Sequence, residues 1–169
     1  MFREMRRFKQ ALSKEASEAV LARGASGVLA LLGDGGYPYT VPMSYAYHDG
    51  RLLFHCALAG HKLDAIAACD KASFCVVDQD QIVPEKYTTY YRSAVAFGRI
   101  RVLADEAGRR AALEVIAAKY SPEHEEGRLK EVERQLPRAC ILELEIEHLT
   151  GKQAMELIRP SGSAPSGSV

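Results

Sequence analysis

The stretch ILELEIE, residues 141–147, alternates apolar and acidic side chains from Leu142 onwards. Successive side chains on a β-strand point to opposite faces, so Leu142, Leu144 and Ile146 share one face and three glutamates share the other. A strand with one buried and one solvated face is typical of antiparallel sheets. This stretch therefore predicts an antiparallel sheet packed on one apolar core.

Two tight turns connect further strands. The apolar run 27–32 is followed by the turn sequence GDGG and by a run rich in tyrosine and valine, 37–47, which together predict a β-hairpin. A second turn at Asp49-Gly50 leads into a strand over 51–56. These turns predict three antiparallel strands in a row.

The remaining elements combine helices with longer strands. We expect strands over 72–78 and 88–103, the second bent or bulged at Gly98. Helices are expected at four places: after Ser13, after Gly60, after Asp105, and from Ser121-Pro122 to Leu136. Strands dominate and follow one another by short turns. The expected fold is mainly β (α+β), an antiparallel, partly closed barrel with peripheral helices.

Composition limits the size and surroundings of this fold. With 169 residues, 47% of them hydrophobic, we expect one domain over 1–160 and a small, polar, disordered tail over 161–169. Because 22 basic side chains balance 22 acidic ones, no general field attracts nucleic acid. No apolar run has the length of a signal peptide or membrane span. We expect a cytoplasmic protein that binds neither nucleic acid nor membrane.

The cysteines and histidines form no metal-ligand pattern. Four cysteines stand singly in apolar surroundings without a C-x-x-C pair, which favours reduced core thiols. His55 and Cys56 are consecutive in a predicted strand, so their side chains point to opposite faces and do not share one ion. We therefore expect no metal site.

The segment FHCALAGHKLDAI, residues 54–66, passes from a strand through Gly60 into a helix that begins at His61-Lys62. A helix start offers unpaired N–H groups and the positive end of the helix dipole. Here Lys62 adds a charge and His61 a further donor. The segment predicts an anion site, most simply for a phosphate. A solvent-exposed Lys–His pair at an ordinary helix start would give the same pattern.

Pro42 interrupts the otherwise strand-like run PYTVPMSYAY. Proline donates no backbone hydrogen bond, so it indicates an edge strand or a break in pairing. Backbone groups over 41–44 would then face a ligand, unless Pro42 marks an edge strand and nothing more. The nearby GDGGYP lacks the G-x-G-x-x-G spacing and precedes a strand, which excludes a Rossmann site. A nicotinamide would therefore bind only as a substrate.

Four blocks follow one another with a characteristic order and spacing: GVLALLGDGGYPYTVPMSYAY, DGRLLFHCALAGHKLDAI, SFCVVDQDQIVPEKYTTYYRSAVAFGRIRVL and ILELEIEHLTGKQA. Together they resemble the nitroimidazole-resistance branch of the pyridoxamine 5′-phosphate oxidase-like, FMN-binding split-barrel superfamily. The resemblance covers residues 5 to 156. It implies a homodimer of six-stranded, Greek-key split barrels with FMN at the subunit interface.

The resemblance also implies where the flavin lies. Its phosphate would bind at Gly60, His61 and Lys62, in agreement with the anion site. The isoalloxazine would lie along one strand and beside the next, with further residues lining the flavin or the interface. These residues are Pro42, Met43 and Ser44 on the first strand, His55, Cys56 and Ala57 on the second, and Tyr90, Tyr91, Arg92 and Lys152 from YTTYYRS and T-G-K. Simple packing would explain the tyrosine-rich strand equally well.

The activity implied is electron or hydride transfer from a reduced donor such as NADH or NADPH to the flavin, then to a small acceptor such as a nitroaromatic. His55 is the candidate proton donor because imidazole titrates near neutral pH. A hydrogen-bonded structural histidine fits the sequence as well. The substrate-phosphate arginines of pyridoxamine phosphate oxidases are not identifiable, which disfavours vitamin B6 oxidation.

Other cofactors and roles fit the same residues. Related split barrels bind haem, and His55, His61 or His148 offers an axial ligand. FAD or a deazaflavin is an alternative to FMN as the bound flavin. A flavin-binding sensor or carrier without turnover is a further alternative, because flavin reduction needs little from side chains.

Overall fold

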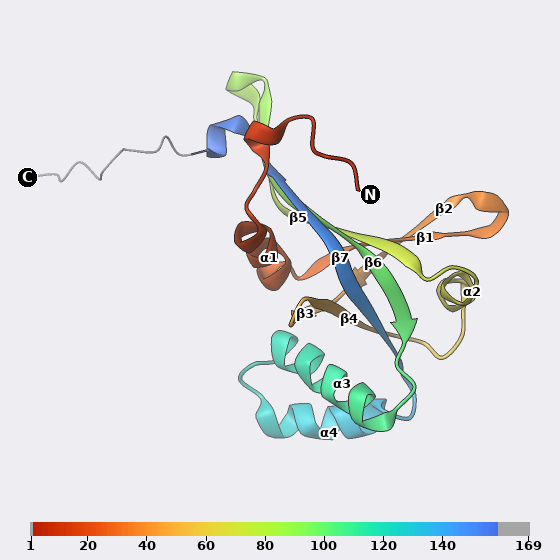
Figure 1. Cartoon of the computed structure of the whole chain (residues 1–169). Helices are drawn as coiled ribbons and strands as arrows, with labels where there is room; N and C mark the ends of the chain where they lie inside the picture. The colour runs from red at the N-terminus through yellow and green to blue at the C-terminus, as the bar shows by residue number, and fades with distance from the viewer. Residues whose placement is uncertain (1, 159–169) are drawn as a thin grey trace, which may run out of the picture.

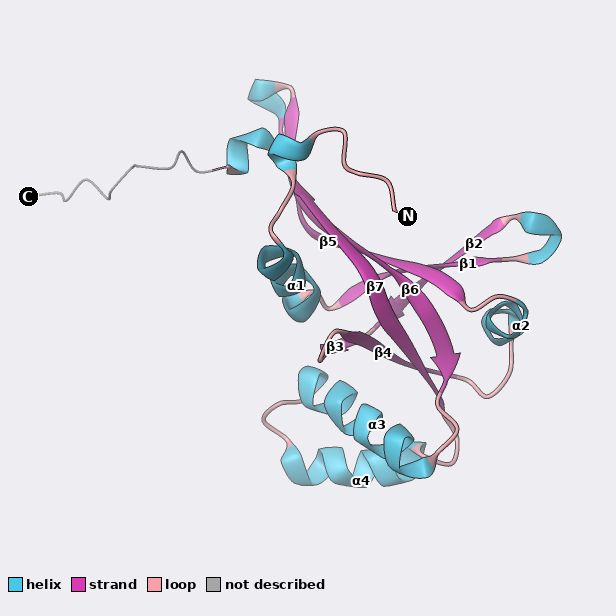
Figure 2. Ribbon diagram, viewed as in Figure 1, coloured by secondary structure: helices cyan, strands magenta, loops and turns pink. Residues whose placement is uncertain are grey.

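The computed structural model describes residues 2–158, so the tail expected over 161–169 lies outside the described residues. Four α-helices and seven strands make up the fold, with short 3₁₀ turns between them (Figure 2). The helices are α1 (Lys14–Arg23), α2 (His61–Ala68), α3 (Glu106–Tyr120) and α4 (Glu125–Gln135). The strands are β1 (Ser26–Leu32), β2 (Pro38–Ser44), β3 (Ala46–His48), β4 (Arg51–Cys56), β5 (Lys71–Val83), β6 (Thr88–Val102) and β7 (Cys140–Gln153).

All seven strands belong to one antiparallel sheet in the order β2-β1-β5-β6-β7-β4-β3. The mainly antiparallel α+β class is confirmed. A six-stranded Greek-key barrel is not confirmed, since the sheet has seven strands and is open between β2 and β3. These two edge strands are separated in sequence by Tyr45 alone, so the sheet curls until its edges meet at one corner (Figure 1).

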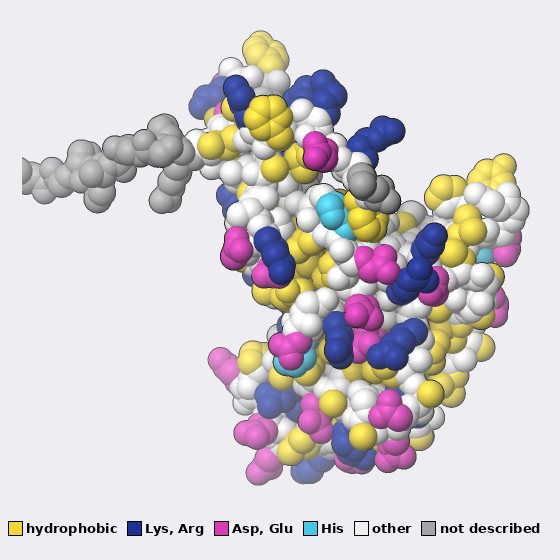
Figure 3. Space-filling model, in the orientation of Figure 1, with side chains coloured by type: hydrophobic (Ala, Val, Ile, Leu, Met, Phe, Trp, Pro, Cys, Tyr) yellow, Lys and Arg dark blue, Asp and Glu magenta, His cyan; other side chains and the backbone are white. Residues whose placement is uncertain are grey.

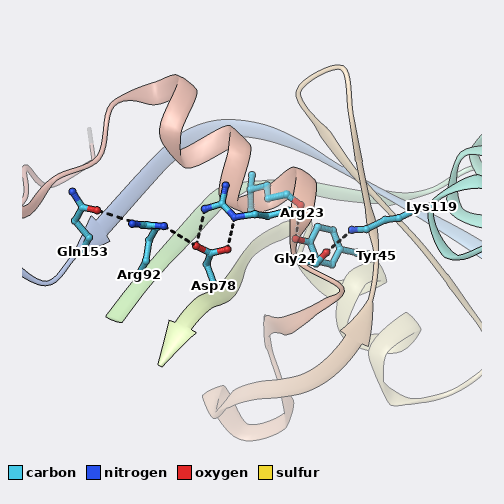
Figure 4. Close-up of polar contacts among 8 residues, drawn as sticks. Arg23, Gly24, Tyr45, Asp78, Arg92, Lys119 and Gln153 are labelled. Carbon is cyan, nitrogen blue, oxygen red and sulfur yellow. Dashed lines mark hydrogen bonds and ion pairs between the residues drawn. The ribbon is translucent and has the colours of Figure 1, made fainter. Parts of the chain in front are cut away.

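Contacts of Tyr45 explain why the strand predicted over 37–47 divides. The Tyr45 side chain is buried and its hydroxyl donates to the Leu21 carbonyl at 2.6 Å. Its backbone N–H donates to the Tyr120 hydroxyl at 2.8 Å, in place of a neighbouring strand. The Lys119 ammonium lies 3.9 Å from the Tyr45 ring centroid and donates to the Gly24 carbonyl (Figure 4). The single middle strand of the predicted row of three is therefore wrong: its first part, β2, pairs with β1, and its second part, β3, pairs with β4.

Apolar clusters pack on both faces of the sheet. Inside the curl, the Phe74 ring lies edge-on to Tyr45 and Phe54, with ring centroids 4.7 and 5.1 Å apart. The helix α1 adds Val20 and Leu21 to this inner cluster. On the outer face, α3 packs on β3, β4 and β7, and α4 packs against α3 (Figure 1). The outer cluster contains Ala46, Leu53, Ala112, Leu113, Ile116, Val132, Leu136, Ala139 and Ile141.

The outer cluster changes the expected alternation in β7. Glu143 was predicted to face water, and this is wrong, because only 5% of the residue is exposed. Arg101 Nη2 and Arg51 Nη1 lie 2.7 and 3.3 Å from its carboxylate oxygens and supply the partners that a buried charge needs. Glu145 and Glu147 remain exposed, as the alternation predicts.

Several local predictions are confirmed. The Ser13 hydroxyl accepts from the Ala16 N–H at 3.1 Å, and the Asp105 carboxylate accepts from the Gly108 N–H at 2.6 Å, so both cap helices. The β6–β7 register shifts between Phe97 and Gly98. A Cβ at Gly98 would lie 1.8 Å from the Glu145 carbonyl oxygen, so this close approach requires glycine.

The visible surface mixes charges of both signs without a large patch of either (Figure 3). Apolar side chains stand out at the ends of the two long hairpins, where Tyr37 and Tyr87 are 77% and 98% exposed. None of the helices over residues 2–158 combines the length and the apolar character needed to cross a membrane.

Candidate functional site

Strand pairing is interrupted where β2 and β4 diverge. The β3–β4 register pairs Ala46 with Leu53, and its continuation past Tyr45 would pair Ser44 with His55. Instead β2 pairs with β1, while β4 at this level pairs with β7 alone among the described residues. We call this interruption, between 42–44 and 54–56, the split. Each strand presents one unpaired edge there, so the edge position predicted from Pro42 is confirmed.

Side chains at the split alternate between the outer face and the inner core. Pro42, Ser44 and His55 are exposed, whereas Met43 and Cys56 pack against the inner cluster. A ligand on the outer face would therefore contact the first three side chains and only the backbone of the other two. The prediction that His55 and Cys56 point to opposite faces is confirmed.

Cys56 lies opposite Cys140 in the β4–β7 ladder. Burial, with a further contribution from the neighbouring Cys140, raises the pKa of the Cys56 thiol to about 11, although the Lys62 ammonium acts in the opposite direction. The Cys56 side chain is therefore a neutral thiol near pH 7. The effect of Lys62 also places its charge close to the end of β4.

The helix α2 begins beside the split. Its N-cap is Gly60, with a φ of 137°, a conformation that favours glycine, and without a side-chain cap. The Gly60 carbonyl accepts the first hydrogen bond of the helix from Leu63 N–H at 2.8 Å. The N–H groups of His61 and Lys62 come before this bond and therefore have no acceptor within the helix. The Lys62 side chain is half-buried. This geometry fits the anion site predicted from the sequence.

His61 has a second set of contacts that the sequence did not indicate. Its ring stacks on Tyr39 of β2 with centroids 4.2 Å apart. Its Nε2 lies 3.4 Å from the Asp34 carboxylate in the β1–β2 turn. His61 therefore connects the start of α2 to the β1–β2 hairpin. Near the start of α2, the groups available to donate hydrogen bonds to an anion are therefore the His61 backbone N–H and the Lys62 side chain.

Of the other predicted residues, Ala57 directly follows β4 and is exposed. The rest lie on β6 and β7, towards the end of the β5–β6 hairpin and away from α2 (Figure 1). Arg92 donates to Gln153 at 3.3 Å and to Asp78 at 3.4 Å (Figure 4). Asp78 occupies the β5 bulge and accepts from Arg23 of α1 at 2.5 and 2.6 Å. The Arg23 guanidinium holds the pKa of Asp78 below its usual value. Arg92 thus belongs to a polar network that attaches α1 to the sheet.

The neighbouring tyrosines of β6 also have partners. The Tyr90 hydroxyl accepts from the Lys86 ammonium at 2.9 Å. The Lys152 ammonium lies 5.4 Å from the Tyr91 ring centroid. The alternation of side chains places Tyr91 and Lys152 on the outer face of the sheet.

One row of residues crosses this outer face. Antiparallel partners share a face, so the registers align side chains from five strands. The row consists of Pro42, Val28, Cys75, Val95 and Thr150. Val28 is 41% exposed, and Val77, two residues beyond Cys75, is 62% exposed. The row links the split to the region of Tyr91 and Lys152.

A cavity of about 330 Å³ lies between the α3–α4 pair and the outer end of the split. Ser44 and His55 contribute to its wall from the sheet. None of the lining residues on α3 and α4 was predicted as part of a site. The apolar period of Leu113 and Ile116 indicates a packed helix face, but no local pattern marks His124 or Arg128 as neighbours of His55.

The sheet order, the split and the adjacent helix start define a mainly antiparallel α+β protein with one open, curled sheet. The family described as pyridoxamine 5′-phosphate oxidase matches residues 13–153, and the chain belongs to this family. A comparison with curated proteins finds no match.

Solved structures with this fold include proteins that bind cofactors. A candidate 5-nitroimidazole antibiotic resistance protein from Bacteroides thetaiotaomicron is 18% identical, with a TM-score of 0.71 over 85% of this chain and 86% of that one. The FAD and heme binding protein from Mycobacterium smegmatis is 23% identical, with a TM-score of 0.72 over 87% and 74% of the chains. A FAD-binding protein from Mesorhizobium loti is 25% identical, with a TM-score of 0.60 over 86% and 97%.

Proposed function

We propose that this protein is a flavin-binding oxidoreductase that holds FMN at the split and passes electrons from a reduced donor to a small acceptor such as a nitroaromatic. The observation that carries the proposal is the unpaired edge of β2 beside the uncapped start of α2 with Lys62. Membership of the pyridoxamine 5′-phosphate oxidase family supports it. So do structural neighbours described as a nitroimidazole resistance candidate and as FAD-binding proteins.

The residues at the split suit the two ends of a flavin nucleotide. The N–H groups of His61 and Lys62, with the Lys62 ammonium, provide donors for the phosphate. The ring system would lie on the outer face along Pro42 and Ser44, with backbone groups of the open edge as its hydrogen-bond partners. A bound flavin supplies the electron transfer, while the protein orients it and limits access of water. His55 would hold or release a proton at its imidazole.

A homodimer follows from the same proposal. The row from Pro42 to Thr150 carries exposed apolar side chains, and a second copy of this chain would cover them. In a two-fold dimer the same surface of both protomers meets, and an axis that crosses the row at a right angle brings opposite ends of the row together. Tyr91 and Lys152 of one protomer would then approach the Pro42 end of the other. This arrangement would bring the predicted site residues on β6 and β7 of one protomer next to those at the split of the other.

Haem is the second candidate cofactor. His55 is exposed at the split, whereas the ring of His61 stacks on Tyr39 and the ring of His148 stacks on Phe2. His55 is therefore the histidine best placed to act as an axial ligand. The neighbour from Mycobacterium smegmatis that binds both FAD and heme supports keeping this alternative.

The visible absorption spectrum of the purified protein tests the choice of cofactor. We expect a flavin spectrum that stays in the supernatant after denaturation and is bleached by NADH or NADPH under anaerobic conditions. A Soret band would replace the flavin proposal by the haem alternative. Flavin that NADH and NADPH do not bleach, and that a nitroaromatic acceptor does not reoxidise after reduction by dithionite, would indicate a carrier or sensor. A colourless protein that takes up neither added cofactor would refute both candidates.

Lys62→Ala tests the phosphate contact. Loss of one charge-assisted hydrogen bond should weaken FMN binding by about 1–3 kcal/mol. Riboflavin, which lacks the phosphate, should bind with equal affinity to the wild-type protein and to the Lys62→Ala variant. Lys71→Ala removes an exposed lysine at the start of β5 and is the matched control. Equal FMN affinity in the Lys62 and Lys71 variants would remove Lys62 from the site.

A further inference from the structure

The cavity beside the split has two ends of different chemistry. Strand residues Ser44 and His55 form the end at the sheet, where the proposed flavin would lie. The far end is formed by α4, which is separated from the sheet by α3 (Figure 1). The volume of the whole cavity, about 330 Å³, is near the lower limit of the roughly 300–1,000 Å³ usual for small-molecule sites.

Apolar side chains line the middle of the cavity. Leu113 and Ile116 of α3 and Val132 of α4 contribute to its walls and are 3 to 5% exposed. The apolar walls and small volume favour a ligand with a compact hydrocarbon body, and a planar ring fits between two helices that pack face to face.

The charged groups of the lining favour an anion. Its titratable groups are those of His55, Tyr120, His124, Arg128 and Glu131. Glu131 accepts from Arg134 Nη2 at 2.6 Å and from Gln135 Nε2 at 2.7 Å, so its charge already has partners. Arg128 has no carboxylate partner among the described residues.

Backbone carbonyls hold the Arg128 side chain in place. Its Nη1 donates to the carbonyls of Ser121 and Pro122 at 3.1 and 2.8 Å, in the loop between α3 and α4. Those contacts use one nitrogen of the guanidinium and leave its positive charge uncompensated. A guanidinium held in this way is prepared for a carboxylate without further loss of side-chain freedom.

We propose that the cavity binds a small planar aromatic carboxylate, with its ring between α3 and α4, its carboxylate at Arg128 and its opposite edge towards Ser44 and His55. The inference rests on the proposed function for its biological meaning, because it names the class of molecule that would meet the flavin at the split. The binding itself requires only residues on α3, α4 and the sheet.

Naphthalene-2-carboxylate is a suitable probe because the chain contains no tryptophan, so the naphthalene fluorescence is free of indole emission. Its affinity is compared with that of naphthalene-2-carboxamide, which has nearly the same shape without the charge. We expect the carboxylate to bind the full-length protein at least about tenfold more tightly, as a charge-assisted contact predicts. Equal affinities for the two probes would overturn the proposal.

Two variants locate the site. Arg128→Gln should abolish the preference for the carboxylate, while Lys130→Gln, which removes a charge from α4 outside the lining, should keep it. Gly127→Leu should weaken both probes, because Gly127 lines the cavity and a Cβ there meets nothing within 4 Å. This change also replaces a poor helix former by a good one, so the fold is retained. A carboxylate preference unchanged in Arg128→Gln would refute the site.

Probe titrations with and without added FMN separate this inference from the proposed function. A protein that binds the carboxylate at Arg128 but takes up no flavin would support the cavity and refute the flavin proposal. A protein that binds FMN but shows no preference for the carboxylate would refute the cavity alone.

Discussion

The outer face of the sheet has two halves that differ in what covers them. Over β4 and β7, the helices α3 and α4 bury Leu53 and Ile141 in an apolar cluster. Over β1, β5 and β6, the row that contains Val28 and Cys75 remains partly exposed, and Val77 beside it is 62% exposed. Contacts within the chain therefore cover one half of the outer face, whereas the other half is open to contact with a second molecule.

The two halves of the outer face should therefore contribute to different properties, the covered half to stability and the exposed half to association. The covered half is formed by contacts within one chain, so its loss should lower the free energy of unfolding directly. The exposed half contributes little to the isolated protomer, and its apolar side chains gain burial only on association. Because the split lies between the two halves, a cofactor there would meet the helical cavity on one side and a dimer partner on the other.

Ile141→Ala should have the largest effect. Ile141 is fully buried under α3 and α4, and truncation of a buried isoleucine costs about 2–5 kcal/mol through lost burial and the cavity left behind. Ile82→Ala makes the same change at a side chain that is 74% exposed and should stay within about 0.5 kcal/mol of wild type. Urea unfolding measures both. Equal losses would show that the covered half does not dominate stability.

Val77→Lys should act on association and spare the fold. A lysine buried against a second copy must lose hydration in both protomers, which should weaken the dimer by more than about 2 kcal/mol, or roughly 30-fold in Kd. Val102→Lys introduces the same change at a 46% exposed valine outside the row. Sedimentation at several concentrations distinguishes the two. A protein that is monomeric before either change would remove the assignment of this face to a dimer.

Local chemistry explains which parts of the fold were predictable from sequence. The caps at Ser13 and Asp105 and the bulge at Gly98 depend on hydrogen bonds or close contacts that particular residue types favour. The division of the strand at Tyr45 depends on Leu21 and Tyr120, which are distant in sequence and carry no local signal. The open, seven-stranded sheet follows from that division and was therefore missed.

The candidate site shows the same limit. The start of α2 with Lys62 was predictable because glycine, a helix start and a basic residue are adjacent in sequence. The cavity was not predictable, because Ser44, His55 and Arg128 line the same cavity only as a result of the packing of α3 and α4 on the sheet. Burial of Glu143 was missed for the same reason, since Arg51 and Arg101 approach it from other strands.

Acid should weaken the two halves of the sheet unequally. The Arg23 guanidinium lowers the pKa of Asp78, so the folded protein favours the ionised carboxylate. The resulting stability is present above the usual aspartate pKa and is lost as the pH falls through the lower pKa of the folded state. Hydrogen exchange should therefore increase in α1 and β5 before it increases in α3 and α4, which share an apolar cluster and are joined by an Arg110–Glu133 ion pair that solvent screens.

Asp78→Asn should reproduce this loss at neutral pH. We expect a cost of roughly 1 kcal/mol, because half-exposed Arg23 leaves the pair partly screened by solvent. The acid-induced change in exchange at α1 should then disappear. Asp80→Asn, two residues further along β5, is the control for the loss of a negative charge. An acid response that persists in Asp78→Asn would assign it to another group.

Alkylation of Cys75 should give the smallest and most local effect. Cys75 is half-buried in the exposed row, and burial raises the pKa of its thiol, so its reaction with N-ethylmaleimide at neutral pH should be slow. If a second copy covers the row, the rate should fall severalfold as the protein concentration passes the dimer Kd. Cys69, at the end of α2, should react at a rate independent of concentration. A Cys75 rate that is equally independent would mean that the two halves of the outer face are both complete within one chain.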